Sequence, residues 1–440
     1  MAPQFGAISF LNNIMTLDRT LAPAYQAFQE INLPQMQTII LKNEQPLFVI
    51  DTATQPVIRF EMFFNAGNKF EEKTGQSYFC NKMLAEGTSQ FSSAEIAERF
   101  ATIGYFYEFS QGAERASITL NGLTKHFQKA VEILLEILSD SIFPEKELQN
   151  LKTISLQQIL INNEKTAYLA SQIFKEELFG PNHYIGRSIK EKDIELISSF
   201  DLVSFYNKYY KEKEFKIVVA GQINTDIIQI IEKSFGHLVV NSESKDYEKE
   251  ANARYEGKQI LIEKEEALQS SIRIGRRAIN RTHSDYFALK VCNTILGGYF
   301  GSRLMKNIRE EKGYTYGISS SHLPLPKFGY LLIGTDVKRE FTQNTIDEIF
   351  KEISTLQQQK VGDDEMEVVK NFLSGDFAGS VNSPFDIADK HKTIIFEHLE
   401  SSFFNNYISQ IQKINSDQVL EMANKYYKKE DLIEIVVGGK

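Results

Sequence analysis

Cysteine and histidine are scarce in this sequence, which limits the chemistry it can carry. The 440 residues contain two cysteines, Cys80 and Cys292, and seven histidines. Two cysteines provide no disulfide framework and no Cys-x-x-Cys metal site, and both lie in apolar runs, so we expect them to be small buried side chains. The sequence has no Gly-x-Ser-x-Gly and no His-Glu-x-x-His, so it gives no support to a serine nucleophile or to a zinc site of that form.

The histidines are scattered, and one spacing alone suggests a site. His391 and His398 stand seven residues apart on one face of an expected helix, with Glu397 beside them. Two residues at this spacing are more often surface residues than metal ligands. We therefore interpret them as surface residues.

The chain also lacks an excess of positive charge and a long apolar run. Its formal charge is −9, which argues against nucleic-acid and anionic-membrane partners. No window approaches the ~20 apolar residues of a membrane-spanning helix, so we expect no membrane insertion. The first residues lack the basic and apolar regions of a signal peptide, so we expect a cytoplasmic protein; a periplasmic location stays open if a signal peptide was removed.

Two pairs of similar segments indicate that the chain is a tandem duplication. "FYNKYYKEKEFKIVVAG" (Phe205–Gly221) resembles "MANKYYKKEDLIEIVVGG" (Met422–Gly439), and "CNKMLAEG" from Cys80 resembles "CNTILGG" from Cys292. Both pairs are separated by similar lengths of chain, as expected for an internal repeat.

A polar, charged stretch between the halves has the composition of a linker. It reads "NSESKDYEKEANARYEGK" over residues 241–258. We therefore expect an N-terminal extension over 1–34, a first domain over 35–240, this linker over 241–258 and a second domain over 259–440.

Within each half, β-rich runs come first and helical patterns follow. In the first half we expect strands at Gln37–Leu41, Leu47–Asp51, Val57–Asn65 and Arg115–Leu120, and helices at Gly75–Leu84, Ser93–Ile103, His126–Ser139 and Glu145–Ile161. The second half repeats this with strands at Gln259–Ile262, Ser271–Arg276 and Leu331–Val337 and a helix at Tyr286–Leu296. The order predicts an α+β fold of two tandem homologous domains, each a mainly antiparallel sheet with helices packed on one face.

Two longer segments resemble the signatures of the pitrilysin/insulinase-type zinc peptidases, the inverzincins. They are "GQSYFCNKMLAEGT" (Gly75 to Thr88) and "LGGYFGSRLMKNIREEKGYTYGISS" (Leu296 to Ser320). The resemblance covers nearly the whole chain from about Leu33, and the second signature is the better preserved one.

The resemblance implies a zinc site that this sequence has lost. Active members carry His-x-x-Glu-His on the first-domain helix and a further Glu ligand downstream. Two residues four apart share a helix face and can hold one zinc, while the Glu serves as general base. Here the His positions fall on Tyr78 and Lys82, the Glu on Asn81 and the downstream ligand on Gln158. We expect no metal or other cofactor in this chain and no peptidase activity from it alone.

The second signature keeps an Arg and a Tyr seven residues apart, Arg309 and Tyr316. The resemblance implies that this pair belongs to the active site and reaches from a second-type domain to the zinc of a first-type domain. A phenol O–H can stabilise the negative charge that forms on a peptide carbonyl oxygen under attack, and a guanidinium can bind neighbouring carbonyls. We prefer this pair over the nearby Arg303 and Tyr314.

Local patterns place the pair at the junction of a helix and a strand. "GSRLMKNIREEKG" predicts a helix that ends at Gly313, and "YTYGISSS" predicts a strand with Tyr314 and Tyr316 on one face. The plain structural alternative is that Arg309 pairs with Glu310 or Glu311 while Tyr316 packs.

The sequence has lost the zinc ligands and has kept the Arg309 and Tyr316 pair, which implies that two different chains supply the two parts of one active site. In some bacterial relatives one chain brings the zinc motif and a zinc-less partner brings Arg and Tyr, around a chamber for unfolded peptides. The alpha-type subunit of the mitochondrial processing peptidase is a related case, but its long glycine-rich loop is missing here. We expect a heterodimer with a homologous zinc-bearing peptidase subunit, and extended or unfolded peptides as substrates. Two alternatives remain: a non-enzymatic scaffold, and a peptide-binding homodimer.

Overall fold

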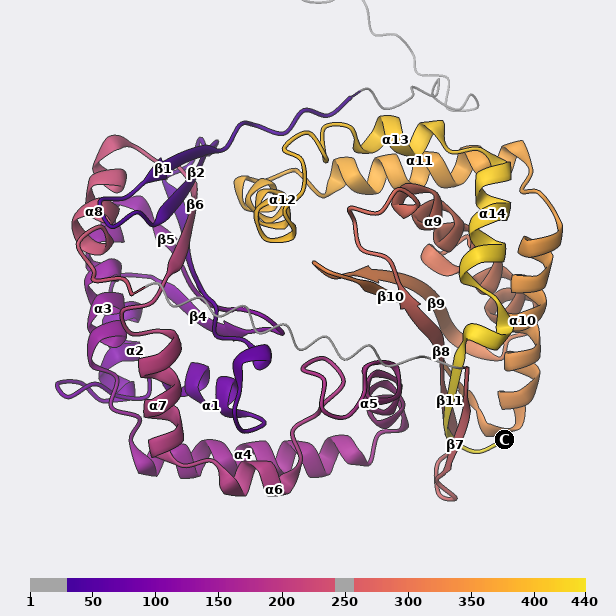
Figure 1. Cartoon of the computed structure of the whole chain (residues 1–440), viewed down its shortest axis with the longest axis horizontal. Helices are drawn as coiled ribbons and strands as arrows, with labels where there is room; N and C mark the ends of the chain where they lie inside the picture. The colour runs from indigo at the N-terminus through magenta and orange to yellow at the C-terminus, as the bar shows by residue number, and fades with distance from the viewer. Residues whose placement is uncertain (1–29, 242–256) are drawn as a thin grey trace, which may run out of the picture.

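Each half of the chain forms one β-sheet in the computed structural model, which describes residues 30–241 and 257–440 (Figure 1). The first sheet has the order β1-β2-β6-β3-β5-β4, with β1 Gln37–Ile40, β2 Pro46–Asp51, β3 Val57–Phe64, β4 Phe106–Gln111, β5 Ala116–Leu123 and β6 Phe215–Gly221. The second has the order β7-β11-β8-β10-β9, with β7 Gln259–Glu263, β8 Gln269–Ala278, β9 Thr315–Pro324, β10 Gly329–Lys338 and β11 Ile433–Gly438.

Both sheets are mainly antiparallel, which confirms the predicted α+β class. One parallel pair occurs in each, β2 with β6 and β7 with β11. In both pairs the last strand of the half returns beside an early one. Most expected strands lie within a few residues of the observed ones, whereas no range was predicted for β4, β6 or β11, and β9 was anticipated only at its start.

Helices cover the outer face of each sheet. In the first half these are α1 Gln76–Met83, α2 Ser93–Thr102, α3 Phe127–Asp140, α7 Ser199–Tyr209 and α8 Thr225–Phe235. In the second half they are α9 Tyr286–Asn293, α10 Thr342–Gln358, α13 Tyr407–Lys413 and α14 Ser416–Tyr426. The burial pattern of β3 explains the arrangement, because alternate residues Ile58, Phe60, Met62 and Phe64 are all buried in the core of the first half.

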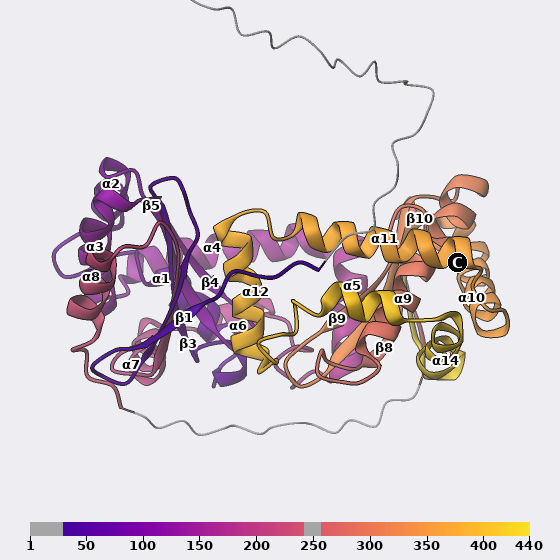
Figure 2. The same ribbon diagram turned by 90° about the horizontal axis from the view of Figure 1, so that it is seen from above.

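One helix of each half packs on the sheet of the other half: α5 (Thr166–Phe179) and α12 (Pro384–Glu397). The remaining helices pack within their own halves: α4 (Glu145–Asn163) and α6 (Glu191–Leu196) in the first, and α11 (Asp363–Gly379) in the second. Phe174 of α5 packs with Ile435 and Tyr330 of the second sheet. Ala388 of α12 packs with Val218 of the first sheet. Figure 2 shows α12 standing against the first sheet.

Polar contacts reinforce this exchange. Arg59 of β3 donates to the Asp389 carboxylate of α12 at 2.7 Å, and Lys392 of α12 donates to Glu61 of β3 at 2.6 Å. In the other direction, Arg273 of β8 donates to the Ser171 hydroxyl of α5 at 3.1 Å. The halves are therefore joined by packed helices and ion pairs as well as by the chain itself.

Local details refine the sequence predictions. Helix α2 begins at Ser93 as expected, and the preceding Ser92 caps it through a reciprocal capping box with Glu95. The expected helix at Tyr286–Leu296 changes to π-helical geometry at Thr294, and the helix expected around Met305 is also π-helical over Met305–Glu311. Wider turns of this kind are common near functional sites.

Two of the expected segments lie largely outside the described residues, namely the extension over 1–34 and the linker over 241–258. Within the described ranges, no helix combines the length and the apolar character that crossing a bilayer requires.

Candidate functional site

Helix α1 holds three of the four positions at which the resemblance implies zinc chemistry. Asn81 is buried, and its amide donates to the Tyr210 hydroxyl at 3.2 Å. Tyr78 is half-buried and meets the ring of Phe79 edge-on. Lys82 is exposed, and its ammonium donates to a backbone carbonyl at 3.3 Å. The helix face is thus occupied by groups that bond to the protein.

The fourth position, Gln158, lies on the exposed side of α4, where its amide donates to the Asn162 side chain at 3.1 Å. The phenol of Tyr78 and the amides of Asn81 and Gln158 do not match the thiolate, imidazole and carboxylate ligands that zinc uses. The Lys82 ammonium is positively charged and repels the metal cation. Among the described residues, no group of three or more His, Cys, Asp or Glu side chains could hold a metal ion. The residues at this position do not fit zinc.

A buried carboxylate caps the start of α1, and sequence reasoning missed it. Glu71 accepts hydrogen bonds from the backbone N–H groups of Gly75 (3.2 Å) and Ser77 (2.9 Å) and pairs with Arg187 at 2.8 Å. Its side chain is 2% exposed. Burial raises the pKa of Glu71 to about 7, and the nearby Arg187 opposes this shift. Gly75 adopts φ +92°, which favours glycine and lets the chain turn into the helix.

Arg309 lies in the π-helical segment before β9 and is held by an aromatic ring. Its guanidinium stands over the Phe300 ring, 4.6 Å from the centroid. The expected alternative, a pair with Glu310 or Glu311, does not form, and Arg309 has no ion pair with any described residue. Phe300 is 63% exposed, so ring and guanidinium face solvent together.

Tyr316 projects into solvent at the start of β9. The residue is 95% exposed, and its hydroxyl has no hydrogen bond to any described residue. The backbone beneath it is fixed, because the Thr315 hydroxyl donates to the Asp336 carbonyl at 2.8 Å and accepts from the Thr335 hydroxyl at 2.9 Å. The pairing of β9 with β10 shifts register here, which marks a bulge. The sequence therefore presents a free phenol on a well-anchored backbone.

The two competing residues of the same region are engaged in packing and pairing. Tyr314 is half-buried and stacks on Phe341 with centroids 4.7 Å apart. Arg303 forms a two-point ion pair with Glu365 of α11, with distances of 3.0 and 2.8 Å, and this pairing raises the pKa of its guanidinium. Gly313 has φ +68° directly after the helical segment, which confirms its predicted terminating role.

Sequence reasoning missed Phe300 as the partner of Arg309. The available signal was a large aromatic side chain set between Gly298 and Gly301, in a segment where little else could pack. The spacing of nine residues between Phe300 and Arg309 does not predict that the ring contacts the guanidinium. The contact depends on the turn between the two π-helical segments.

The expectation for the two histidines near the end of α12 was partly wrong. His391 is buried and not a surface residue, and its Nε2 lies 2.9 Å from the Pro34 carbonyl. His398 closes α12 with φ 54°, a left-handed conformation. The two rings therefore serve different local roles and form no site.

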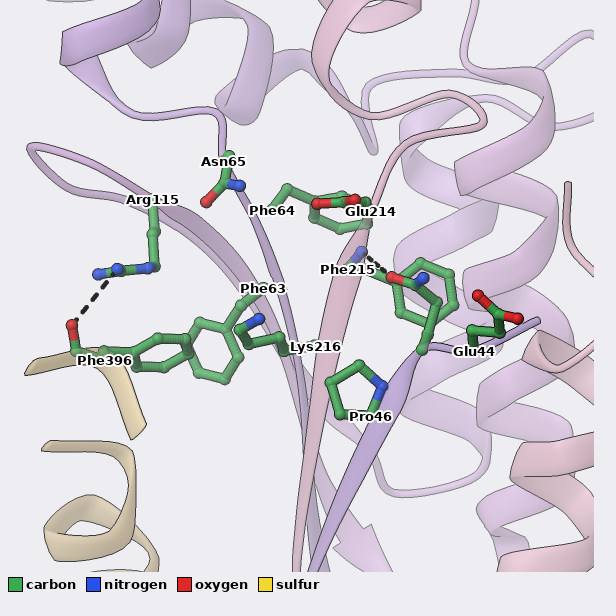
Figure 3. Close-up of a pocket in the computed structure, with 11 residues that line it drawn as sticks. Glu44, Pro46, Phe63, Phe64, Asn65, Arg115, Glu214, Phe215, Lys216 and Phe396 are labelled. Atoms are coloured by element: carbon green, nitrogen blue, oxygen red, sulfur yellow. Dashed lines mark hydrogen bonds between the residues drawn. The ribbon is translucent and has the colours of Figure 1, made fainter. Parts of the chain in front are cut away.

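A cavity lies where the first sheet meets the end of α12, and Figure 3 shows the residues that line it. Arg115 reaches across from the first half and stacks on the Phe396 ring at 4.4 Å. Phe63 meets the same ring edge-on. These contacts join the two halves, and the charged residues around them do not assemble a catalytic group.

Comparison with protein families gives two successive matches along the chain. Residues 47–182 match the model for "Insulinase (Peptidase family M16)", and residues 197–373 match that for "Peptidase M16 inactive domain". Together the two matches span more than half of the chain.

Curated relatives match along nearly the full length. An "Uncharacterized zinc protease YmxG" of Bacillus subtilis is 25% identical over 383 residues, covering 85% of this chain and 91% of the relative. A "Non-peptidase homolog YmxG" of Helicobacter pylori is 24% identical over 422 residues, covering 94% of each.

Solved structures share the fold. A peptidase M16 inactive domain from Pseudomonas fluorescens superposes with a TM-score of 0.81 at 22% identity, covering 92% of this chain and 99% of that one. A protease from Helicobacter pylori gives a TM-score of 0.83 at 16% identity, covering 92% and 100%.

Proposed function

The chain belongs to the M16 family of peptidases, and from this premise we propose that it is the zinc-less subunit of a heterodimeric zinc-dependent peptidase. In this proposal a homologous partner carries the zinc, extended or unfolded peptides are the substrates, and this chain contributes Arg309 and Tyr316. It is inactive alone because its own zinc positions hold Tyr78, Asn81 and Lys82 on α1.

The observation that carries the proposal is that both side chains are available: the Tyr316 phenol has no hydrogen bond, and the Arg309 guanidinium has no ion pair, with any described residue. Tyr316 is 95% exposed on a backbone anchored by threonine hydroxyls, and Arg309 is oriented by Phe300 without being neutralised. Donors that no other protein group uses stay available to a substrate, which is what a functional site requires of them. Tyr314 and Arg303 are already occupied, which supports the choice of the other two.

Each group would act on a different part of the substrate. The Tyr316 O–H would donate to the peptide carbonyl oxygen as negative charge develops on it during attack by water, so it acts mainly in the transition state. The Arg309 guanidinium would bind neighbouring backbone carbonyls of the extended peptide, so it acts in the bound substrate as well.

A non-enzymatic role is the competing function. The Helicobacter pylori relative carries the name "Non-peptidase homolog", which favours a scaffold or peptide-binding role for this group. The two functions differ in one outcome: only the first requires that a pair with a zinc-bearing relative cleave peptides.

The test is a pull-down from the source cells, followed by reconstitution of the pair and a peptidase assay. We expect a zinc-bearing relative to be recovered with the chain, as an assembly that buries ~2,000 Å² or more. The chain alone should cleave nothing, and the pair should be active. Recovery of the chain only as a monomer or a homodimer would contradict the proposal.

Tyr316→Phe in the active pair then tests the assigned role. The change removes one O–H and keeps the ring, so kcat should fall by roughly 10²–10³ while pairing persists. Tyr314→Phe is the matched control and should be nearly silent, because its ring stacks on Phe341. Wild-type kcat in both variants would transfer support to the scaffold function.

A further inference from the structure

A polar cavity of about 230 Å³ lies in the second half, away from Arg309 and Tyr316. Its walls come from α9, from the middle of β9 and from α11, and the side chains that matter are Lys290, Asn293, Thr294, Ser321, His322 and Asp376. The position of this cavity in the second half can be compared with the zinc positions of the first half through the internal repeat. The offset that relates Cys80 to Cys292 also relates Tyr78 to Lys290 and Asn81 to Asn293.

The second half therefore has a cavity on the helix face that corresponds to the zinc positions of the first. Asn81 is covered in the first half by Tyr210, with which it bonds. In the second half the equivalent Asn293 accepts from the Tyr427 and Ser320 hydroxyls at 2.9 and 2.7 Å and forms the floor of the cavity. The buried polar floor is satisfied and rigid, which is what a binding site requires of its supporting residues.

Lys290 provides a positive charge in the cavity that has no direct partner among the described residues. Its ammonium has no hydrogen bond or ion pair with any described residue, although the residue is only partly exposed. Burial is the main cause that lowers the pKa of Lys290, and the Asp376 carboxylate opposes this. A buried cation without a partner costs free energy unless something supplies the missing contacts.

The neighbouring positive charges are already neutralised or stacked. Arg281 pairs with Glu397, and the Lys390 ammonium lies near the rings of Phe377 and Phe404, 5.9 and 5.7 Å from their centroids. Asp376 adds a negative charge to the same cavity and would repel a doubly charged phosphate group. One cation beside this carboxylate therefore suits a singly charged carboxylate ligand better.

Acceptors complete the set. Asp376 is exposed and has no ion pair with any described residue. His322 Nε2 donates to the Ile279 carbonyl at 2.8 Å, and burial lowers the pKa of His322 to about 4, so near neutral pH its Nδ1 is an acceptor. The cavity thus has a cation, Lys290, on one wall and two acceptors, Asp376 and His322, on others. This arrangement matches a ligand whose carboxylate carbon lies one or two bonds from an N–H group.

We propose that this cavity binds the α-carboxylate of an amino acid or of a peptide C-terminus, with Lys290 holding the carboxylate and Asp376 accepting from the adjacent nitrogen. The volume admits one or two small residues and not a folded chain. The inference does not depend on the zinc-bearing partner, because the whole site lies in this chain.

The test is calorimetric titration of the purified chain alone with three probes: alanine, N-acetyl-alanine and alanine amide. The amide lacks the carboxylate and should not bind detectably. Lys290→Met should weaken alanine or N-acetyl-alanine binding by at least about tenfold, since it removes the ion pair. Lys413→Met, an exposed lysine at the end of α13, is the matched control and should bind as the wild type does.

The acetylated probe separates the two sources. Equal affinity for acetylated and free alanine would assign the site to peptide C-termini, whose adjacent nitrogen is an amide N–H. A loss on acetylation of about tenfold, repeated by Asp376→Asn with free alanine, would assign it to free amino acids, whose adjacent nitrogen is an ammonium. Absence of wild-type binding at about 10 mM, equal binding of the amide, or unchanged binding in Lys290→Met would overturn the proposal. The probe comparison needs no variant, so it holds even if Lys290→Met misfolds.

Discussion

A guanidinium stacked on an exposed ring, as Arg309 is on Phe300, is held in one place while its N–H donors stay available. An ion pair would fix the side chain equally well but would use those donors. This difference between Arg309 and Arg303, which is paired with Glu365, is why substitutions of the two arginines should have opposite consequences.

Arg309→Ala in the active pair should raise KM by roughly tenfold, since a guanidinium that binds substrate carbonyls contributes before the transition state as well as in it. Thermal unfolding of the chain should change little, because an exposed cation–π contact contributes only ~0.5–1 kcal/mol. Arg303→Ala should have the opposite effects: it should lower the free energy of unfolding and leave KM nearly unchanged. Steady-state kinetics and thermal denaturation of both variants check this, and a stable Arg309→Ala protein with unchanged KM would rule the role out.

Glu71 should make stability depend on pH in an unusual direction for an acid. Its folded-state pKa is raised from 4.5 to about 7, so the folded state binds the proton more tightly than the unfolded state does. The contribution is full at low pH and is lost as pH rises from about 4.5 to about 7, with a magnitude of about 3 kcal/mol.

Urea unfolding of the wild type and of Glu71→Gln across that pH range measures this contribution. The wild type should lose stability relative to the variant as pH rises. A constant difference between the two would show that Arg187 and the helix N–H groups keep the carboxylate ionised throughout.

At the scale of single elements, α12 shows how a local sequence signal supports a long-range contact. Ser383 and Asp386 form a reciprocal capping box, and Pro384 opens the first turn. The cap fixes where the helix begins, and that start places Arg59 against the Phe385 carbonyl at 2.8 Å.

Ser383→Ala should lower the free energy of unfolding by about 1 kcal/mol, the usual cost of losing an N-cap hydroxyl. Ser401→Ala, at an exposed serine without a hydrogen bond to a described residue, is the control and should be neutral. Chemical denaturation measures both, and equal stability of the two variants would show that Asp386 and Pro384 hold the helix start without the hydroxyl.

At the scale of the whole molecule, the exchanged helices make each half part of the other's core. The Phe174 ring of α5 lies over Gly275 of β8, where a Cβ would come within 2.9 Å of it, and the ring is 1% exposed. A glycine at that strand position leaves room for the aromatic side chain of the other half.

Phe174→Ala should cost ~3–5 kcal/mol and should also separate the unfolding of the two halves, because it removes a fully buried contact of α5 with the second sheet. Phe127→Ala is the matched control, since its ring is fully buried within the core of the first half. Differential scanning calorimetry should show two transitions for Phe174→Ala and one for Phe127→Ala. A single transition in both would mean that α12 alone couples the halves.

Much of this architecture follows from the sequence by itself. Hydrophobic alternation and turn residues placed most strands and the helices α1 to α4 and α9 within a few residues, and the repeated segments indicated two similar halves, because these signals depend on residues close together along the chain. Residue chemistry at Tyr78, Asn81 and Lys82 was enough to exclude zinc ligation, since no fold can make an ammonium a metal ligand.

Other features were decided by tertiary structure. Sequence spacing could not show that Phe300 orients Arg309, that Glu71 is buried at the start of α1, or that Lys290 stands unpaired in a cavity between α9 and α11. The sequence also could not show that α5 packs on the second sheet and α12 on the first. Each of these depends on contacts between residues far apart in the chain, and their energies are set by burial and by the distances between side chains, which exist only once the sheets and helices have packed.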